Sequence, residues 1–157
     1  MTEGRAGSYT PEPMTEGQIE QRSRLRDEEP PDESVVVVRG GPDTIDKIAK
    51  NAVRTARAWT LDGEPLEGIS VFCALDPTGD GSLDGVLSTM RSYRLVHLCR
   101  AGDLRTNGYE LLPTATRPHY TLLPAGGATL IPERLLAALG EAQPNPFHQR
   151  RLNPPGR

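Results

Sequence analysis

Residues 34–41, which read Ser34-Val-Val-Val-Val-Arg-Gly-Gly41, decide the fold of this 157-residue chain. The four valines are β-branched and do not alternate with polar residues, which predicts a strand that is covered on both faces. The two glycines and Pro42 are expected to end this strand, and Asp43 or Thr44 can cap a helix. In residues 44–59, apolar side chains recur at steps of three and four, which predicts an amphipathic helix directly after the strand.

The rest of the chain predicts four more strands and up to three more helices. The predicted strands are residues 69–75, 93–99, 109–112 and 119–123, and the predicted helices follow Ser82, span a single turn at 102–107 and begin at Pro132. Elements in this order predict a single small domain of the α/β or α+β class. We expect a mixed sheet of about five strands with three to four helices.

The two ends of the chain differ in charge from its centre. Residues 1–33 contain four arginines against nine acids and few large apolar residues, so they are predicted to form a disordered acidic tail. Residues 34–142 are the expected globular domain, and residues 143–157 an extended basic tail. Although the whole chain has a formal charge of −3, residues 35–157 carry only +2. This weak charge argues against a general nucleic-acid binder.

Cysteine content and hydropathy limit the chemistry and the location that we expect. Cys73 and Cys99 lie far apart in apolar runs, which predicts buried free thiols rather than a disulfide or a metal site. No apolar run reaches membrane-spanning length, and the N-terminus lacks a hydrophobic signal region. The sequence therefore predicts a cytoplasmic protein with no membrane association.

The first candidate site is the turn that follows the valine strand. Arg39 supplies a guanidinium, and Gly40 and Gly41 precede the free backbone amides of the helix that begins near Thr44. These groups together can bind a phosphate or another anion. The competing interpretation is a tight turn at a strand end with a solvated arginine.

The second candidate is a set of three residues on three strands. Arg39 ends the first strand, Ser70 lies within the second and Glu110 begins the fourth. Their order resembles the arginine, serine and glutamate pattern of one class of ADP-ribosyltransferases. The resemblance implies that Arg39 anchors the phosphates of NAD, that Ser70 stabilises the nicotinamide-side pocket and that Glu110 polarises the ribose. Alternatively, Ser70 is a small core residue and Glu110 is a solvated residue at a strand edge.

His119 and Tyr120 start a strand directly after Pro118, and alternation sends their side chains to opposite faces of the sheet. His119 is a candidate for acid–base chemistry, and Tyr120 for contact with a nicotinamide or a base. Both residues can equally cap a strand near the surface.

These sites lead to one enzymatic hypothesis. In it, the protein is a transferase of the ADP-ribosyltransferase type that acts on NAD or another nucleotide, for example as a toxin or conflict-system effector. The catalytic residues would be Glu110, Ser70 and His119, and the cofactor-binding residues would be Arg39, Gly40, Gly41 and Tyr120.

The alternative hypothesis is a non-catalytic interaction module. Four cations, Lys47, Lys50, Arg54 and Arg57, form a basic stripe on the predicted helix, away from its apolar side chains. This stripe is suited to an acidic protein partner. The chain's own acidic residues between 27 and 33 are a further candidate to cover the region around Arg39 and limit access to it.

Overall fold

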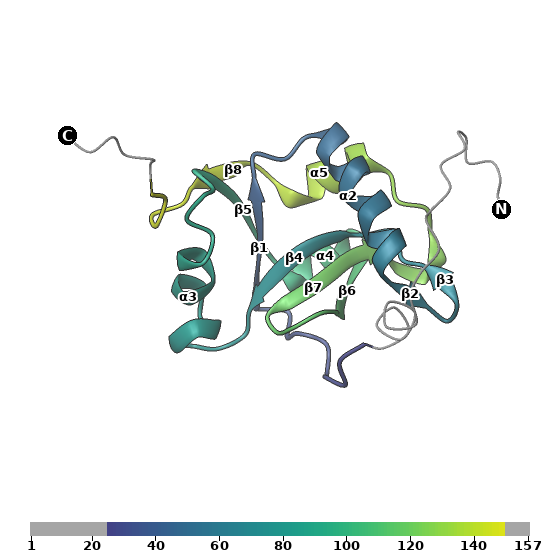
Figure 1. Cartoon of the computed structure of the whole chain (residues 1–157), viewed down its shortest axis with the longest axis horizontal. Helices are drawn as coiled ribbons and strands as arrows, with labels where there is room; N and C mark the ends of the chain where they lie inside the picture. Colours follow the sequence, from purple (N-terminus) through teal and green to yellow (C-terminus); the bar gives the residue numbers. More distant parts are fainter. Residues whose placement is uncertain (1–24, 150–157) are drawn as a thin grey trace.

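The computed structural model describes residues 25–149, which form one domain around a six-stranded sheet (Figure 1). The strands of this sheet are β1 (Val36–Gly41), β4 (Ile69–Ala74), β5 (Leu95–Arg100), β6 (Tyr109–Pro113), β7 (His119–Pro124) and β8 (Ala142–Pro144). The helices are α2 (Ile45–Ala58), α3 (Leu83–Ser88), α4 (Ala101–Thr106) and α5 (Pro132–Leu139), with 3-10 turns η1 (Gly79–Gly81) and η2 (Ala125–Gly127). A separate hairpin joins β2 (Thr60–Leu61) to β3 (Glu64–Pro65). The predicted single small α+β domain is confirmed.

The strand order is β6-β7-β4-β1-β5-β8, with the valine-rich β1 between β4 and β5. All five pairings within this sheet are antiparallel, which is more regular than the mixed directions that we expected. The hairpin of residues 60–65 lies outside the strands and helices that the sequence predicts. The sequence pattern also missed the short edge strand β8.

Hydrophobic cores cover the two faces of the sheet. On one face, which we name the helical face, β1, β4, β6 and β7 pack against α2, α4 and α5; this core includes Val37, Ile48, Val71, Leu104, Tyr120, Leu122 and Leu135. On the other, which we name the α3 face, the core consists of Val38, Val86, Leu87, Met90 and Val96, with Phe72 packed against it. The prediction that the first strand is buried on both faces is therefore confirmed by Val37 and Val38, each fully buried.

Helix α2 forms where the sequence predicts it. Thr44 is its N-cap and accepts a hydrogen bond from the Lys47 amide at 3.1 Å. The buried residues of α2 are Ile48, Asn51 and Thr55, which recur on successive turns of the helix. Two of these three residues are polar, so the contact between helix and sheet includes hydrogen bonds as well as apolar packing.

Residues 25–35 contain no helix or strand of the domain but lie along its lower edge in Figure 1. Arg26 donates its backbone N–H to the Pro113 carbonyl at 3.1 Å, and the Gly102 amide donates to the Glu33 carbonyl at 2.9 Å. This segment therefore joins the end of β6 to the start of α4. The rest of the predicted acidic tail, residues 1–24, and residues 150–157 of the predicted basic tail lie outside the described residues. Among residues 25–149, no helix is long and apolar enough to cross a membrane.

Candidate functional site

Arg39 lies near the end of β1 with its guanidinium turned inward. Its Nε donates to Asp43 Oδ2 at 2.7 Å, and its Nη1 donates to Asn51 Oδ1 at 2.6 Å and to the Ser70 carbonyl at 2.7 Å. The Arg39 side chain is 13% exposed and that of Asp43 is 1% exposed. A charged side chain with so little access to solvent needs both an opposite charge and hydrogen bonds, and the Arg39 guanidinium has both. The guanidinium thereby joins β1 to α2 and β4.

Asp43 occupies the place where the sequence suggested a bound anion. Its Oδ1 accepts the Thr44 backbone N–H at 3.0 Å, while Oδ2 accepts from Arg39. Negative charge is favoured at a helix N-terminus, and here the chain supplies that charge itself. The guanidinium and the helix start that were expected to hold a phosphate are therefore both used by a carboxylate of the protein.

Gly40 and Gly41 belong to β1, where they pair with β5 rather than form an open turn. A Cβ atom on Gly40 would lie 2.4 Å from the Tyr93 ring, and one on Gly41 would lie 2.9 Å from the His97 ring. These rings cover the positions from which an anion would approach the backbone. The expected phosphate-binding turn is thus a packed strand end, with side-chain rings lying over both glycines.

His97 extends the polar network to the C-terminal end of α5. Its Nε2 accepts the Asp43 backbone N–H at 3.0 Å, so its Nδ1 carries the proton and donates to the Gly140 carbonyl at 2.8 Å. Asn51 adds another link, because its Oδ1 also accepts the Ser70 backbone N–H at 3.1 Å. The network of Arg39, Asp43, Asn51 and His97 consequently fixes α2 and α5 on the sheet.

The three residues that resemble the ADP-ribosyltransferase pattern do not meet through their side chains. Arg39 bonds to the backbone of Ser70, whose side chain belongs to the opposite, α3 face, between Ile69 and Val71 of the helical-face core. Alternation likewise places Glu110 on the α3 face, on β6, which β7 and β4 separate from β1. The structure therefore brings neither the Ser70 hydroxyl nor the Glu110 carboxylate to the guanidinium.

His119 and Tyr120 belong to different clusters on opposite faces. The His119 ring makes an edge contact with Phe72, with ring centroids 5.6 Å apart, and its Nδ1 lies 2.9 Å from Thr114 Oγ1. Burial lowers the pKa of His119 from its ordinary value, and the positive charge of Arg26 acts in the same direction. Among the described residues, no carboxylate forms a hydrogen bond with the His119 ring. His119 therefore has no acidic partner for acid–base catalysis there.

Tyr120 is fixed by the segment that precedes β1. Its hydroxyl donates to Glu28 Oε1 at 2.7 Å, and the Arg26 guanidinium lies 4.9 Å from the centre of its ring. Arg26 also pairs with Glu28 at 2.8 Å, which lowers the pKa of that carboxyl. Burial, together with Glu28, raises the pKa of Tyr120 to about 12. The acidic residue Glu28 therefore lies against β7 and not against the basic stripe of α2.

The basic stripe itself is exposed along α2. Its members Lys47, Lys50, Arg54 and Arg57 lie on the solvent side of the helix, with Ile45 at 45% and Val53 at 46% exposure. The Lys50–Asp46 ion pair, at 3.2 Å, involves two side chains that are about three-quarters solvated, so it contributes little to stability. This surface combines cations with aliphatic side chains.

Several residues of these clusters were missed at the level of sequence. Asp43 stands four positions after Arg39, a spacing that fits an ion pair, but it was interpreted only as a cap. Asn51 is a polar residue on the apolar side of a helix, which was the available signal of a buried network. Nothing in the sequence links His97 to Gly140. Residues 25–149 contain no group of three or more histidines, cysteines or acids that could hold a metal ion.

Comparison with known proteins adds no relative to these observations. No protein-family model, no curated protein and no solved structure matches this chain.

Proposed function

We propose that this protein is a non-catalytic interaction module that docks an acidic protein partner on the exposed side of α2. One observation carries the proposal: four cations and two half-exposed aliphatic side chains share the solvent side of one 14-residue helix. Such a helix is about 21 Å long, which suits a partner helix or strand laid along it. The NAD-directed alternative has no comparable support, because Arg39 is closed within its own network.

Val53 is the centre of the proposed contact. Along the helix, Lys50 lies three residues before it and Arg57 four residues after it, so both are its neighbours on the helix surface. An apolar centre with a charged rim is the usual arrangement of protein interfaces. A partner would place an apolar side chain on Val53 and carboxylates around it, which would speed association by electrostatic attraction.

An acidic protein fits this surface better than a nucleic acid does. Residues 35–157 carry a formal charge of only +2, which is too little for general attraction to a phosphate backbone. Helix α2 has no aromatic side chain on which bases could stack. The four cations of the stripe lie close together on one helix, which favours a local contact with an acidic segment.

Site-specific photo-crosslinking in the producing cells tests where a partner binds. A photo-reactive residue at position 53 is compared with one at position 93, because Val53 on α2 and Tyr93 in the loop before β5 have nearly equal exposure, 46% and 44%. We expect position 53 to give crosslinks that map to an acidic protein segment, and position 93 to give none to that segment. Equal yields at both positions, or crosslinks to nucleic acid at position 53, would overturn the proposal.

Affinity measurements with the crosslinked partner then test the charges. The triple variant K47E/K50E/R54E should raise Kd by about tenfold or more, and the loss should be smaller at high salt. The matched control R91E/R94E/R100E makes the same change of charge at three exposed positions, two before β5 and one at its last residue. If both triple variants bind as the unmodified protein does, α2 is not the docking surface.

A further inference from the structure

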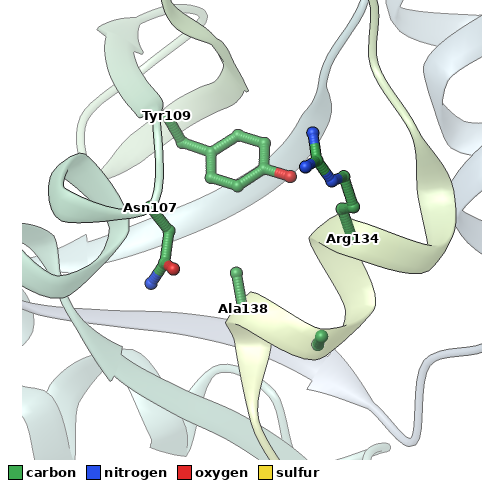
Figure 2. A pocket seen from close by; sticks show the side chains of 5 residues that line it. Asn107, Tyr109, Arg134 and Ala138 are labelled. Carbon is green, nitrogen blue, oxygen red and sulfur yellow. The ribbon is translucent and has the colours of Figure 1, made fainter.

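A cavity of about 410 Å³ lies apart from α2's exposed side and from the Arg39 network. It is lined by Asn107, Tyr109, Arg134, Ala137 and Ala138, from the end of α4, the start of β6 and one side of α5 (Figure 2). This volume falls within the range of small-molecule pockets. The lining combines two apolar methyl groups with three polar side chains.

Tyr109, whose ring is buried, directs its hydroxyl into the cavity. The residue is 7% exposed, and Figure 2 shows its hydroxyl directed toward the Arg134 guanidinium across the cavity. Within residues 25–149, no group forms a hydrogen bond with this hydroxyl. Burial raises the pKa of Tyr109, while the charge of Arg134 acts in the opposite direction. The hydroxyl therefore faces the cavity with its donor and acceptor capacity open to a ligand or to water.

Arg134 supplies a positive charge at the same place. It is exposed on α5, and no carboxylate of the described part of the chain pairs with it. Asn107 donates through Nδ2 to the Asp103 carbonyl at 2.9 Å, which leaves its Oδ1 available. The donors on the cavity side are therefore a guanidinium and a phenol, a combination that suits an oxyanion. A metal cation is disfavoured, because Arg134 is positive and no carboxylate from residues 25–149 lines the cavity.

We propose that this cavity binds a small organic anion, whose carboxylate or phosphate group accepts hydrogen bonds from Arg134 and Tyr109. The apolar body of the ligand rests against Ala137 and Ala138, and the Asn107 amide oxygen accepts from a donor on it. This site is independent of the docking surface on α2.

Benzoate and phenyl phosphate are the probes, because they share one ring and differ in the oxyanion. Each is titrated into ¹⁵N-labelled full-length protein and followed by amide chemical shifts. We expect saturable shifts at Asn107, Tyr109 and Ala138 with at least one probe, and the tighter probe identifies the oxyanion that the site prefers. If neither probe gives saturable shifts at these residues at millimolar concentration, the proposal is overturned.

Two variants test the roles of the polar groups. R134Q should weaken binding by about tenfold or more, and Y109F by about fivefold, since the first removes a charged donor and the second a neutral one. The control R100Q removes an exposed arginine on β5 and should bind as the unmodified protein does. Y109F should also unfold at a temperature no lower than the unmodified protein, because its lost hydroxyl has no partner to leave unpaired. Unchanged affinity in both R134Q and Y109F would overturn the assignment, as would equal losses in R100Q.

The two proposals fail separately. Substitution of the α2 cations in K47E/K50E/R54E should leave the probe titration unchanged, because none of these residues lines the cavity. If that variant weakens both partner docking and probe binding, the cavity is not an independent site and this inference fails.

Discussion

Arg39 and Asn51 are joined by one hydrogen bond of 2.6 Å, and the accepting amide oxygen of Asn51 also accepts the backbone N–H of Ser70. One side-chain oxygen thus links β1, α2 and β4. Its neighbour Asp43 supplies the negative charge that the buried guanidinium needs. The physical role of the arginine that seemed suited to a phosphate is therefore to hold a helix on the sheet.

R39A should destabilise the protein strongly. The substitution leaves the Asp43 carboxylate, 1% exposed, without its ion pair, and breaking a buried pair in this way costs about 3–5 kcal/mol of unfolding free energy. Urea unfolding followed by circular dichroism measures the loss. The exposed Arg100 gives the control, since R100A should change the unfolding free energy by no more than about 0.5 kcal/mol. If R39A were as stable as R100A, the arginine would instead be free for a ligand.

His119 should make stability depend on pH near neutrality. Its folded-state pKa is lowered by burial, so the stability that it contributes is complete above the unfolded pKa of about 6.5 and is lost as pH falls through the folded value. The variant H119Q should have a flatter profile of unfolding free energy between about pH 7.5 and about pH 5. E28Q is the matched comparison, because the lowered pKa of Glu28 acts only in the more acidic window. Equal slopes for H119Q and the unmodified protein would show that His119 is not the titrating group.

Both cysteines should resist alkylation in the folded protein. Burial raises the pKa of Cys73 to about 12, and burial raises the pKa of Cys99 to about 11, whereas the thiolate is the reactive form. With iodoacetamide at about pH 8, mass spectrometry should show little modification in buffer and full modification in concentrated urea. Modification of Cys73 at the same rate in both conditions would contradict its burial in the helical-face core.

G68A should cost more stability than G40A. A Cβ atom on Gly68 would lie 2.6 Å from the Leu122 carbonyl oxygen, which the β4–β7 pairing holds in place, so we expect a loss of about 1–3 kcal/mol. On Gly40 the added atom meets only the ring of Tyr93, a side chain that is 44% exposed and can turn aside. The urea concentrations at the unfolding midpoints of G68A and G40A show which variant loses more stability. A larger loss in G40A would mean that the Tyr93 ring is held rigidly over β1.

The fold was largely predictable from the sequence, because its main elements depend on local patterns. The valine run of β1 and the spacing of apolar residues in α2 are signals within one element, and Thr44 marks the helix start directly. Strands β2, β3 and β8 were missed because two or three residues carry too little pattern. The strand order depends on contacts between distant segments, and these leave no periodic signal.

The sites were less predictable because, like the strand order, they depend on contacts between distant segments. Whether Arg39 faces solvent or core depends on which strand lies beside β1, and that is decided by residues 69–74. Asp43 was visible in the sequence, but its burial was not. Tyr109 and Arg134 lie 25 positions apart in the sequence and share a cavity only because α5 crosses near the start of β6.

The central place of β1 has a consequence for synthesis of the chain on the ribosome. The strand β1 is synthesised early, but its partners β4 and β5 are complete only at residues 74 and 100. The other partner of β4, strand β7, is complete only at residue 124. Through most of translation, a nascent chain therefore presents an apolar strand with at least one open edge. Sheets with such distant pairings form slowly, and unpaired apolar strands attract other chains. Chaperone contact with this protein should accordingly concentrate on residues 35–38 until the first hundred residues have emerged.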